Sequence, residues 1–138
     1  MIDCYFIRGP ISKSSIGIRQ NDTGAIAIFE GHVRADVLQN KRVEAIDFTL
    51  EPLMAKPIAI DLLNKLVANY YLHLAIIWHS QGLVQANDCC FRVEIHGAHR
   101  KEVFGALPEI VDAFKREVPV FGKEIFNDHT YGWKRNRD

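Results

Sequence analysis

The order of hydrophobic patterns along the chain limits its fold more than any other feature. Two segments, 53–69 and 99–117, repeat apolar residues with the period of an α-helix. Short apolar segments bounded by turn signals surround them and predict strands. The expected strands are 3–8, 25–34, 43–50, 72–80, 89–97, 120–126 and 130–134. Helices that follow pairs of strands predict an α+β fold with antiparallel strand pairing.

Polar residues and prolines set the expected limits of these elements. The sequence NDTG at 21–24 predicts a turn, and the polar segment 35–42 predicts a mobile loop. Pro57 is expected in or near the first turn of the first helix, where a missing N–H is tolerated. Pro108 is expected to break or kink the second helix.

The size and charge of the chain exclude some classes of function. Its 138 residues suit one domain, which we expect to span 1–138. Seventeen basic residues balance 17 acidic ones, so no overall charge would attract nucleic acid or an anionic membrane. No aromatic platform is interleaved with basic residues, which further disfavours a nucleic-acid-binding module. Any anion site must therefore be a local cluster of charge.

The sequence also predicts a compartment. The N-terminal residues MIDCYFIRGP lack a basic leader followed by an apolar run, and no apolar run approaches the ~20 residues of a membrane span. Adjacent Cys89 and Cys90 would point to opposite faces of a strand, so they are badly placed to form a disulfide. No cysteine pair has C-x-x-C spacing. We therefore expect a cytoplasmic protein with reduced thiols.

The second helix carries the first candidate functional residue, Lys115. Seven apolar residues share one helical face: Val103, Phe104, Leu107, Ile110, Val111, Phe114 and Val118. Lys115 falls at the edge of this stripe, roughly a quarter-turn from its centre. A lysine there can extend its ammonium group harmlessly into solvent. Alternatively, partial removal from water would make it a usable amine or a proton-transfer group.

Two other basic positions lie at the ends of expected strands. In HGAHRKE, residues 96–102, a strand ends and the second helix begins, so backbone N–H groups, His99 and Arg100 converge on one corner. This corner is a plausible anion or phosphate site, although a surface helix start with incidental charge has the same pattern. Arg34 ends a strand and opens a loop, a usual place for ligand-contacting residues. Together these three basic positions could converge on a phosphorylated ligand.

The sequence predicts no metal site and no cofactor. His96 and His99 lack the glutamate-centred H-E-x-x-H pattern of zinc enzymes. Asp88 and Glu94 form no recognisable acid/base pair. The remaining histidines lack metal-ligand spacing and are expected to be structural: His32, His73, His79 and His129.

An ordered series of motifs gives the chain a family resemblance. The motifs are DTGAIAIFEGHVR, VEAIDFTLEPLMAKPIAI, the expected turn HSQGLV, GAHRKEVF, and KREVPVFGKEIF followed by Trp133-Lys134. From about Asp22 to Trp133, the chain resembles the large catalytic subunit of molybdopterin synthase, the MoaE family. This resemblance implies an α/β hammerhead-type domain with an additional antiparallel β-sheet.

The resemblance also implies an activity and partners. Family members form a homodimer, and each protomer binds a small ubiquitin-like sulfur carrier to give a heterotetramer. The carrier's C-terminal Gly-Gly tail, as a thiocarboxylate, donates sulfur to cyclic pyranopterin monophosphate. Two such transfers form the dithiolene of molybdopterin, a step in molybdenum cofactor biosynthesis.

Residue roles follow from the motif matches. Lys115 matches the essential lysine near the end of the last helix, whereas Arg34, His99 and Arg100 match residues that bind the substrate's phosphate and pterin. Part of this set would come from the partner protomer.

One position departs from the family pattern. Gly122 stands where a second active-site lysine is expected, and Lys123 matches the basic residue that follows it. We predict Lys123 as a second catalytic lysine if a glycine bulge re-aims it, because adjacent strand residues face opposite ways. Otherwise the pocket would work with Lys115 alone, and the C-terminal KRNRD could supply an arginine. A different hypothesis is a non-catalytic subunit that binds the carrier without turnover.

Overall fold

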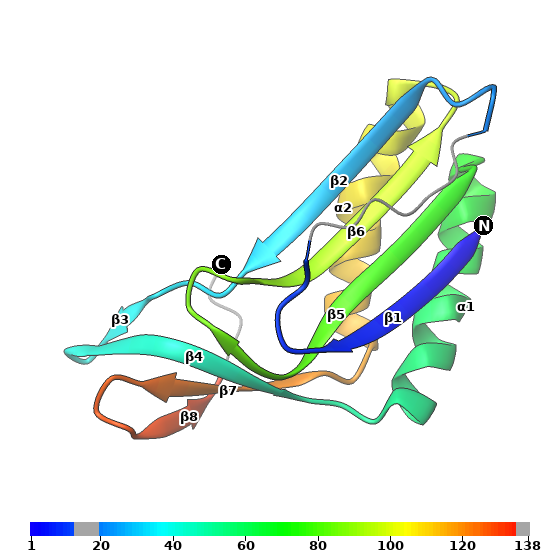
Figure 1. Cartoon of the computed structure of the whole chain (residues 1–138). Helices are drawn as coiled ribbons and strands as arrows, with labels where there is room; N and C mark the ends of the chain where they lie inside the picture. Colours follow the sequence, from blue (N-terminus) through cyan, green and yellow to red (C-terminus); the bar gives the residue numbers. More distant parts are fainter. Residues whose placement is uncertain (13–19, 135–138) are drawn as a thin grey trace.

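Eight strands and two helices make up the part of the chain that the structure describes. The structure is a computed structural model and describes residues 1–12 and 20–134. The strands are β1 (Ile2–Arg8), β2 (Ala25–His32), β3 (Val37–Leu38), β4 (Lys41–Thr49), β5 (Leu74–Gln85), β6 (Cys89–Gly97), β7 (Phe121–Phe126) and β8 (Tyr131–Trp133). The helices are α1 (Pro52–Tyr70) and α2 (Arg100–Glu117), each placed after a strand and before the next (Figure 1).

All eight strands belong to one continuous sheet. The order is β2-β6-β5-β4-β7-β8, with β1 also paired to β5 and β3 paired to β4. Every pair is antiparallel except β1 with β5, which run parallel. The predicted α+β fold is therefore confirmed, whereas antiparallel pairing throughout was wrong for β1. Parallel strands need a long connection, and three strands and a helix lie between β1 and β5 along the chain.

Strand β5 joins two parts of this sheet. Its first part, Ala75–Gln81, pairs with β1, and 82–85 pair with β4. Gly82 lies between them with φ of +83°, a left-handed conformation that glycine adopts without steric cost. The HSQGLV segment was predicted as a turn, but it lies inside this strand. The additional antiparallel sheet that the resemblance implied is formed by β4, β7, β8 and the end of β5.

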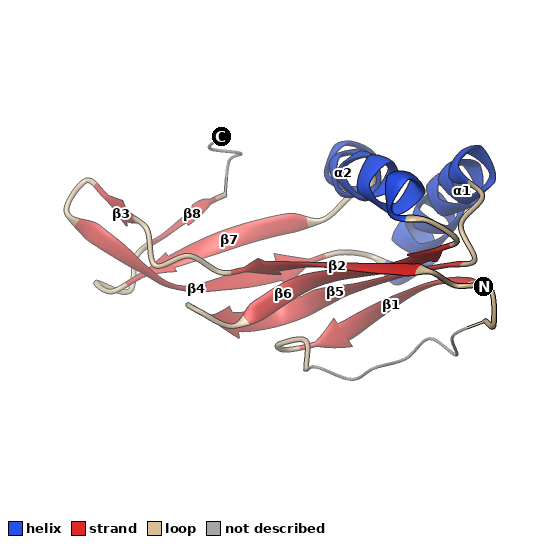
Figure 2. Ribbon diagram, turned by 90° about the horizontal axis from the view of Figure 1, so that it is seen from above, coloured by secondary structure: helices blue, strands red, loops and turns tan. Residues whose placement is uncertain are grey.

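Both helices cover the same face of the part of the sheet formed by β1, β5, β6 and β2 (Figure 2). The largest buried cluster lies between these layers and includes Leu63, Ile77, Val93, Ile95 and Ile110. The additional sheet has its own smaller cluster, formed by Val33, Val43, Ile46, Phe48 and Val84. The two clusters meet where α2 ends and β7 begins, since Val120 packs against both.

The helices differ from their predicted forms in three ways. Helix α1 begins at Pro52, capped by the Glu51 carboxylate that accepts from the Leu53 N–H, so Pro57 lies in the second turn rather than the first. Helix α2 continues through Pro108 and is not broken there. Some residues of the predicted apolar stripes are exposed, namely Met54, Ile58 and Phe104.

The segment 35–42 contains a hairpin rather than only a loop. Leu38 pairs with Lys41, and both turn residues, Gln39 and Asn40, have positive φ, as in a type I′ turn. The polar residues that suggested a loop belong to this short turn and its flanking strands. Within the described residues, neither helix is both long enough and apolar enough to cross a membrane.

Candidate functional site

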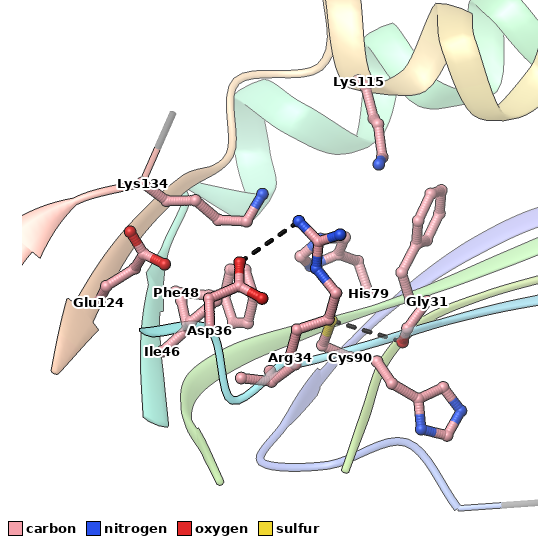
Figure 3. Close-up of a pocket in the computed structure, with 13 residues that line it drawn as sticks. Gly31, Arg34, Asp36, Ile46, Phe48, His79, Cys90, Lys115, Glu124 and Lys134 are labelled. Atoms are coloured by element: carbon pink, nitrogen blue, oxygen red, sulfur yellow. Dashed lines mark hydrogen bonds and ion pairs between the residues drawn. The ribbon is translucent and has the colours of Figure 1, made fainter. Parts of the chain in front are cut away.

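A cavity of about 250 Å³ lies where the two parts of the sheet meet the C-terminal end of α2. We call it the cationic pocket. It is lined by Gly31, His32, Val33, Arg34, Asp36, Ile46, Phe48, His79, Cys90, Phe91, Lys115, Glu124 and Lys134. Figure 3 shows the side chains of Arg34, Lys115 and Lys134 pointing toward a common space from three different segments. These segments are far apart in the sequence, so the pocket exists only in the folded chain.

Arg34 reaches the pocket from the segment that follows β2. The preceding residue, Val33, is buried and exchanges backbone hydrogen bonds with the turn between β5 and β6: its N–H donates to Asp88 O, and its carbonyl accepts from the Asn87 N–H. These bonds fix the backbone from which the arginine projects. Its guanidinium lies 3.4 Å from the Asp36 carboxylate and remains largely exposed. Arg34 is therefore positioned by its backbone and open to a ligand.

Lys115 lies in the last turn of α2. The adjacent Phe114 is buried in the main cluster, so Lys115 emerges at the rim of that cluster. A basic residue in the last helical turn also interacts favourably with the helix dipole. The Lys115 side chain lines the cavity, and its role there stays a prediction. It keeps contact with water, since the residue is exposed.

His79 forms part of the buried wall of the pocket. Its ring packs against Phe48, Phe91 and Phe114, with centroid distances of 5.0, 5.4 and 5.5 Å. Burial, together with the nearby positive charges of Lys115 and Lys134, lowers the pKa of His79 to about 4. Nδ1 lies 2.8 Å from the Ser80 carbonyl, which can only accept, so Nδ1 carries the proton and Nε2 the lone pair.

No sequence motif placed His79 in the site. It was expected to be structural, and its packing against three phenylalanines agrees with that role. Its position on the cavity wall depends on the course of β5, which no spacing of histidines indicates.

Strand β7 presents alternate residues to the pocket. Glu124 lines the pocket and Gly122 lines a neighbouring cavity, whereas Lys123 lines neither. The Lys123 ammonium instead lies over the Tyr131 ring, 4.8 Å from its centroid, on the other face of the strand. The register of β7 with β4 is regular at this point, and its shift lies between Val43 and Ala45 instead. The bulge that could have re-aimed Lys123 is therefore not found at Gly122.

Lys134 completes the set of basic residues around the pocket. It follows β8 directly and lines both the cationic pocket and a neighbouring cavity. The sequence indicated only that KRNRD could supply an arginine, and the two arginines of that segment lie outside the described residues. Lys134 was not singled out from the sequence. Its place beside β7 follows from the register of β8 with β7, which the sequence does not determine.

The neighbouring cavity is smaller, and most of the residues that line it are apolar. Its volume is about 130 Å³, and it shares Phe48, His79, Phe91, Lys115 and Lys134 with the cationic pocket. The remaining wall is formed by Phe114, Val118, Val120 and Gly122. We call it the apolar recess. Together the two cavities form a space with an apolar end and an end that carries three basic and two acidic side chains.

His99 and Arg100 lie at the opposite end of α2 from Lys115. Fifteen residues of helix separate Arg100 from Lys115, which corresponds to roughly 22 Å along the axis. His99 caps the helix without a side-chain hydrogen bond, and its Nδ1 lies 3.7 Å from the Glu102 carboxylate. Within one chain, the structure brings Arg34 and Lys115 together but leaves His99, Arg100 and Lys123 outside the pocket.

One group of side chains offers donor atoms suited to a metal. Donor atoms of Glu30, His32 and Cys89 lie within 4.8 Å of one another. However, the Glu30 carboxylate already pairs with His32 at 2.9 Å and with Arg92 at 3.0 Å. These ion pairs account for the cluster without a metal.

The histidine His96 and the acid Glu94 form a pair that sequence spacing did not indicate. Both are buried, and His96 Nε2 lies 2.7 Å from the Glu94 carboxylate. They lie on β6, on the face opposite the helices, with Arg92 next to Glu94. Through Arg92 the network continues to Glu30 and His32. His32 lines the pocket, but His96 does not.

Comparisons with known proteins agree with this architecture. A family model described as MoaE protein matches residues 9–117. The molybdopterin synthase catalytic subunit of Thermoplasma volcanium is 31% identical over 116 residues, which cover 84% of each protein. The corresponding protein of Oryza sativa subsp. indica is 30% identical over 121 residues, covering 88% of this chain but only 62% of the rice protein. The chain thus spans less than two thirds of the rice protein's length.

Solved structures share the fold. Molybdopterin synthase from Staphylococcus aureus superposes with a TM-score of 0.85 at 22% identity and covers 96% of both chains. A complex of subunits 1 and 2 of molybdopterin-converting factor from Helicobacter pylori matches with a TM-score of 0.71 at 15% identity, covering 97% of this chain and 91% of that one. The family model covers most of the chain, and the order of strands and helices agrees with these structures. The chain therefore belongs to the MoaE family.

Proposed function

We propose that the cationic pocket transfers sulfur from a thiocarboxylated carrier protein to cyclic pyranopterin monophosphate, as in molybdopterin synthase. The observation that supports this proposal is the convergence of Arg34 and Lys115 on one cavity, next to a recess with apolar walls. Curated relatives are named molybdopterin synthase catalytic subunits. A non-catalytic, carrier-binding role is not favoured, because both basic residues that the reaction needs line the pocket.

The reaction follows from the chemistry of the two partners. The thiocarboxylate sulfur of the carrier attacks a side-chain carbon of the pterin. A carbon–sulfur bond forms as a carbon–oxygen bond at that carbon breaks, and the oxygen leaves on the phosphate or as water. Water then cleaves the bond between the carrier's acyl carbon and the sulfur. The carrier leaves as a carboxylate, and the sulfur stays on the pterin as a thiolate. A second carrier repeats the sequence at the neighbouring carbon.

Lys115 and Arg34 have different tasks in this sequence. The Lys115 ammonium stabilises the negative charge that develops during attack or carries a proton to the pterin. The Arg34 guanidinium binds the substrate phosphate and holds the pterin for attack, which makes the step effectively unimolecular. The apolar recess has a volume of only about 130 Å³ and is lined in part by Lys115, so it suits an extended Gly-Gly tail without side chains.

The pocket's own cysteine is a poor sulfur carrier. Burial raises the pKa of Cys90 to about 11, so its thiol stays protonated near neutral pH. The thiolate is the nucleophilic form of cysteine. Since Cys90 is the one described cysteine that lines the pocket, sulfur delivered by a separate carrier fits the site better than a relay through this side chain.

Oligomeric assembly would complete the site. The solved Helicobacter pylori complex holds two different subunits of molybdopterin-converting factor. For this chain we propose a homodimer that binds one carrier per protomer. His99 and Arg100 of one protomer would then reach the pocket of the other, which explains why they lie far from the pocket in their own chain. A cytoplasmic location remains a prediction.

Turnover with a defined sulfur donor tests the proposed function. Purified protein is mixed with cyclic pyranopterin monophosphate and a carrier whose C-terminus is either a thiocarboxylate or a carboxylate. We expect dithiolene product only with the thiocarboxylate. Calorimetry on the same samples measures carrier binding. Carrier binding without product would overturn the enzymatic proposal and favour the non-catalytic one.

A further inference from the structure

The register of β7 and β8 places Lys134 opposite Gly122. Lys123 pairs with Trp133, and the ladder continues with a hydrogen bond of 2.7 Å from the Lys134 N–H to the Gly122 carbonyl. Side chains that lie opposite each other in a ladder project to the same face of the sheet. Gly122 lines the apolar recess, so the Lys134 side chain projects to that side of the sheet as well. Lys123 and Trp133 share the other face.

Gly122 lies beside the Lys134 side chain and leaves room for Ile46. A Cβ atom at position 122 would lie 3.0 Å from Ile46 Cγ2, 3.4 Å from Phe48 Cε1 and 3.6 Å from Lys134 Cβ. The glycine has no left-handed φ, so the backbone conformation does not require it there. The absence of a side chain therefore avoids a tight contact with Ile46, whereas a Cβ atom would meet Lys134 only at an ordinary van der Waals distance.

Lys134 also has a favourable electrostatic position. It lines both cavities, as Lys115 does, and its positive charge contributes to the field at the buried His79. The pocket carboxylates of Asp36 and Glu124 lie nearby, with Glu124 on the same face of β7. An anion bound between Lys115 and Arg34 would therefore meet a third basic group.

We infer that Lys134 is a substrate-binding residue that supplies the pocket with a second ammonium group across the strand from Gly122. This inference rests on the proposed function for the identity of the substrate, but not for the anion site itself. The ligand class is a phosphate monoanion or dianion attached to an organic ring. The lysine completes an anion site with Arg34 and Lys115, while Lys123, adjacent to Gly122 in sequence, stays outside it.

Two measurements on the same variants test the inference. The first is sulfur-transfer kinetics with the thiocarboxylated carrier, and the second is a ³¹P NMR titration with inorganic phosphate, which needs no turnover. In Lys134→Met we expect KM for the pterin and Kd for phosphate to rise about tenfold, with a smaller change in kcat, because one charged hydrogen-bond donor is lost. Lys134→Arg keeps the charge, so its KM for the pterin and its Kd for phosphate should stay within about threefold of the wild-type values.

Two other lysines separate this role from a general effect of charge. Lys65→Met removes an exposed lysine of α1 that pairs with Asp61. Lys123→Met removes the lysine that sequence reasoning favoured. We expect the Kd for phosphate of both variants to stay within about twofold of the wild-type value, because neither lysine lines the pocket. Thermal unfolding of each variant confirms the fold, and Lys134→Gln provides a second neutral variant.

The outcomes are distinct. Wild-type phosphate affinity in Lys134→Met, or a larger loss in Lys123→Met than in Lys134→Met, would overturn the inference. Failure of the wild type to bind phosphate would also overturn it. If phosphate binding depends on Lys134 but the wild type produces no dithiolene, the anion site stands and the proposed function fails.

Discussion

The two ends of α2 carry similar residues but differ in what surrounds them. At the N-terminal end, His99 and Arg100 are exposed, and the carboxylate of Glu102 lies within the first turn. At the C-terminal end, Lys115 faces Arg34 and Lys134 across a cavity that four other segments help to enclose. A cluster of basic residues at a helix end therefore makes a site only where other parts of the chain close around it.

The difference also indicates how an assembly would use the helix. The N-terminal end has charge but no pocket within its own chain, whereas the C-terminal end has a pocket with open access. The two would be complementary if a second copy brought its N-terminal end to the first copy's pocket. Variants at each end of α2 would test this difference.

The largest effect is expected at Lys115. Lys115→Ala should lower kcat for dithiolene formation by about 10² to 10³, because it removes a positive group aimed at the developing charge. The measurement is product formation with saturating carrier. Arg116→Ala is the matched control, since Arg116 lies in the same helical turn, pairs with Glu117 and does not line the pocket. Equal losses of kcat in the two variants would show that the effect comes from disturbing the helical turn rather than from the pocket.

The buried His79 should make the stability of the fold depend on pH. Its folded-state pKa of about 4 lies below the ordinary value of 6.5, so the unfolded chain binds a proton more readily. Stability is therefore full above about pH 6.5 and falls toward pH 4, by about 3 kcal/mol in total. Urea unfolding at several pH values measures this. The curve of His79→Gln should be flatter over the same range, and parallel curves would contradict the assignment.

Arg34 should affect substrate binding more than the chemical step. Arg34→Gln is expected to raise KM for the pterin about 10- to 50-fold with a smaller fall in kcat, because a charged hydrogen bond to phosphate contributes about 1.5–3 kcal/mol. Arg42→Gln, on β4 and outside the pocket, controls for loss of a nearby positive charge. A fall in kcat alone would give Arg34 a different role.

The smallest effect tests the N-terminal end of α2. We expect Arg100→Ala and Lys115→Ala homodimers to be weakly active. Mixed dimers of the two variants should regain about half of the wild-type activity per dimer, because one of the two pockets then has both residues intact. Activity of re-mixed, purified subunits measures this. No recovery would show that Arg100 does not act across the dimer.

Much of this structure could be predicted from the sequence because local patterns determine it. The two helices and most strands followed from hydrophobic period, and the resemblance indicated the additional sheet. The parallel pairing of β1 and the length of β5 could not be predicted, since register and pairing depend on contacts between distant segments.

The same limit applies to the pocket. Arg34 and Lys115 were predicted from motifs, and both line the cavity. The sequence did not predict that Lys134, His79 and Glu124 line the cavity. Their places follow from the register of β7 with β8 and from the left-handed backbone at Gly82. The face on which Lys123 lies did follow from strand alternation, although its participation could not be decided from sequence.

A crystal structure of the wild-type protein with cyclic pyranopterin monophosphate, without the sulfur carrier, tests the central claim most directly. No turnover occurs in the absence of the sulfur donor, so the bound substrate stays intact. We expect its phosphate within hydrogen-bonding distance of the Arg34 guanidinium and its side chain beside the Lys115 ammonium. Substrate bound at His99 and Arg100, remote from Arg34 and Lys115 of either protomer, would contradict the account.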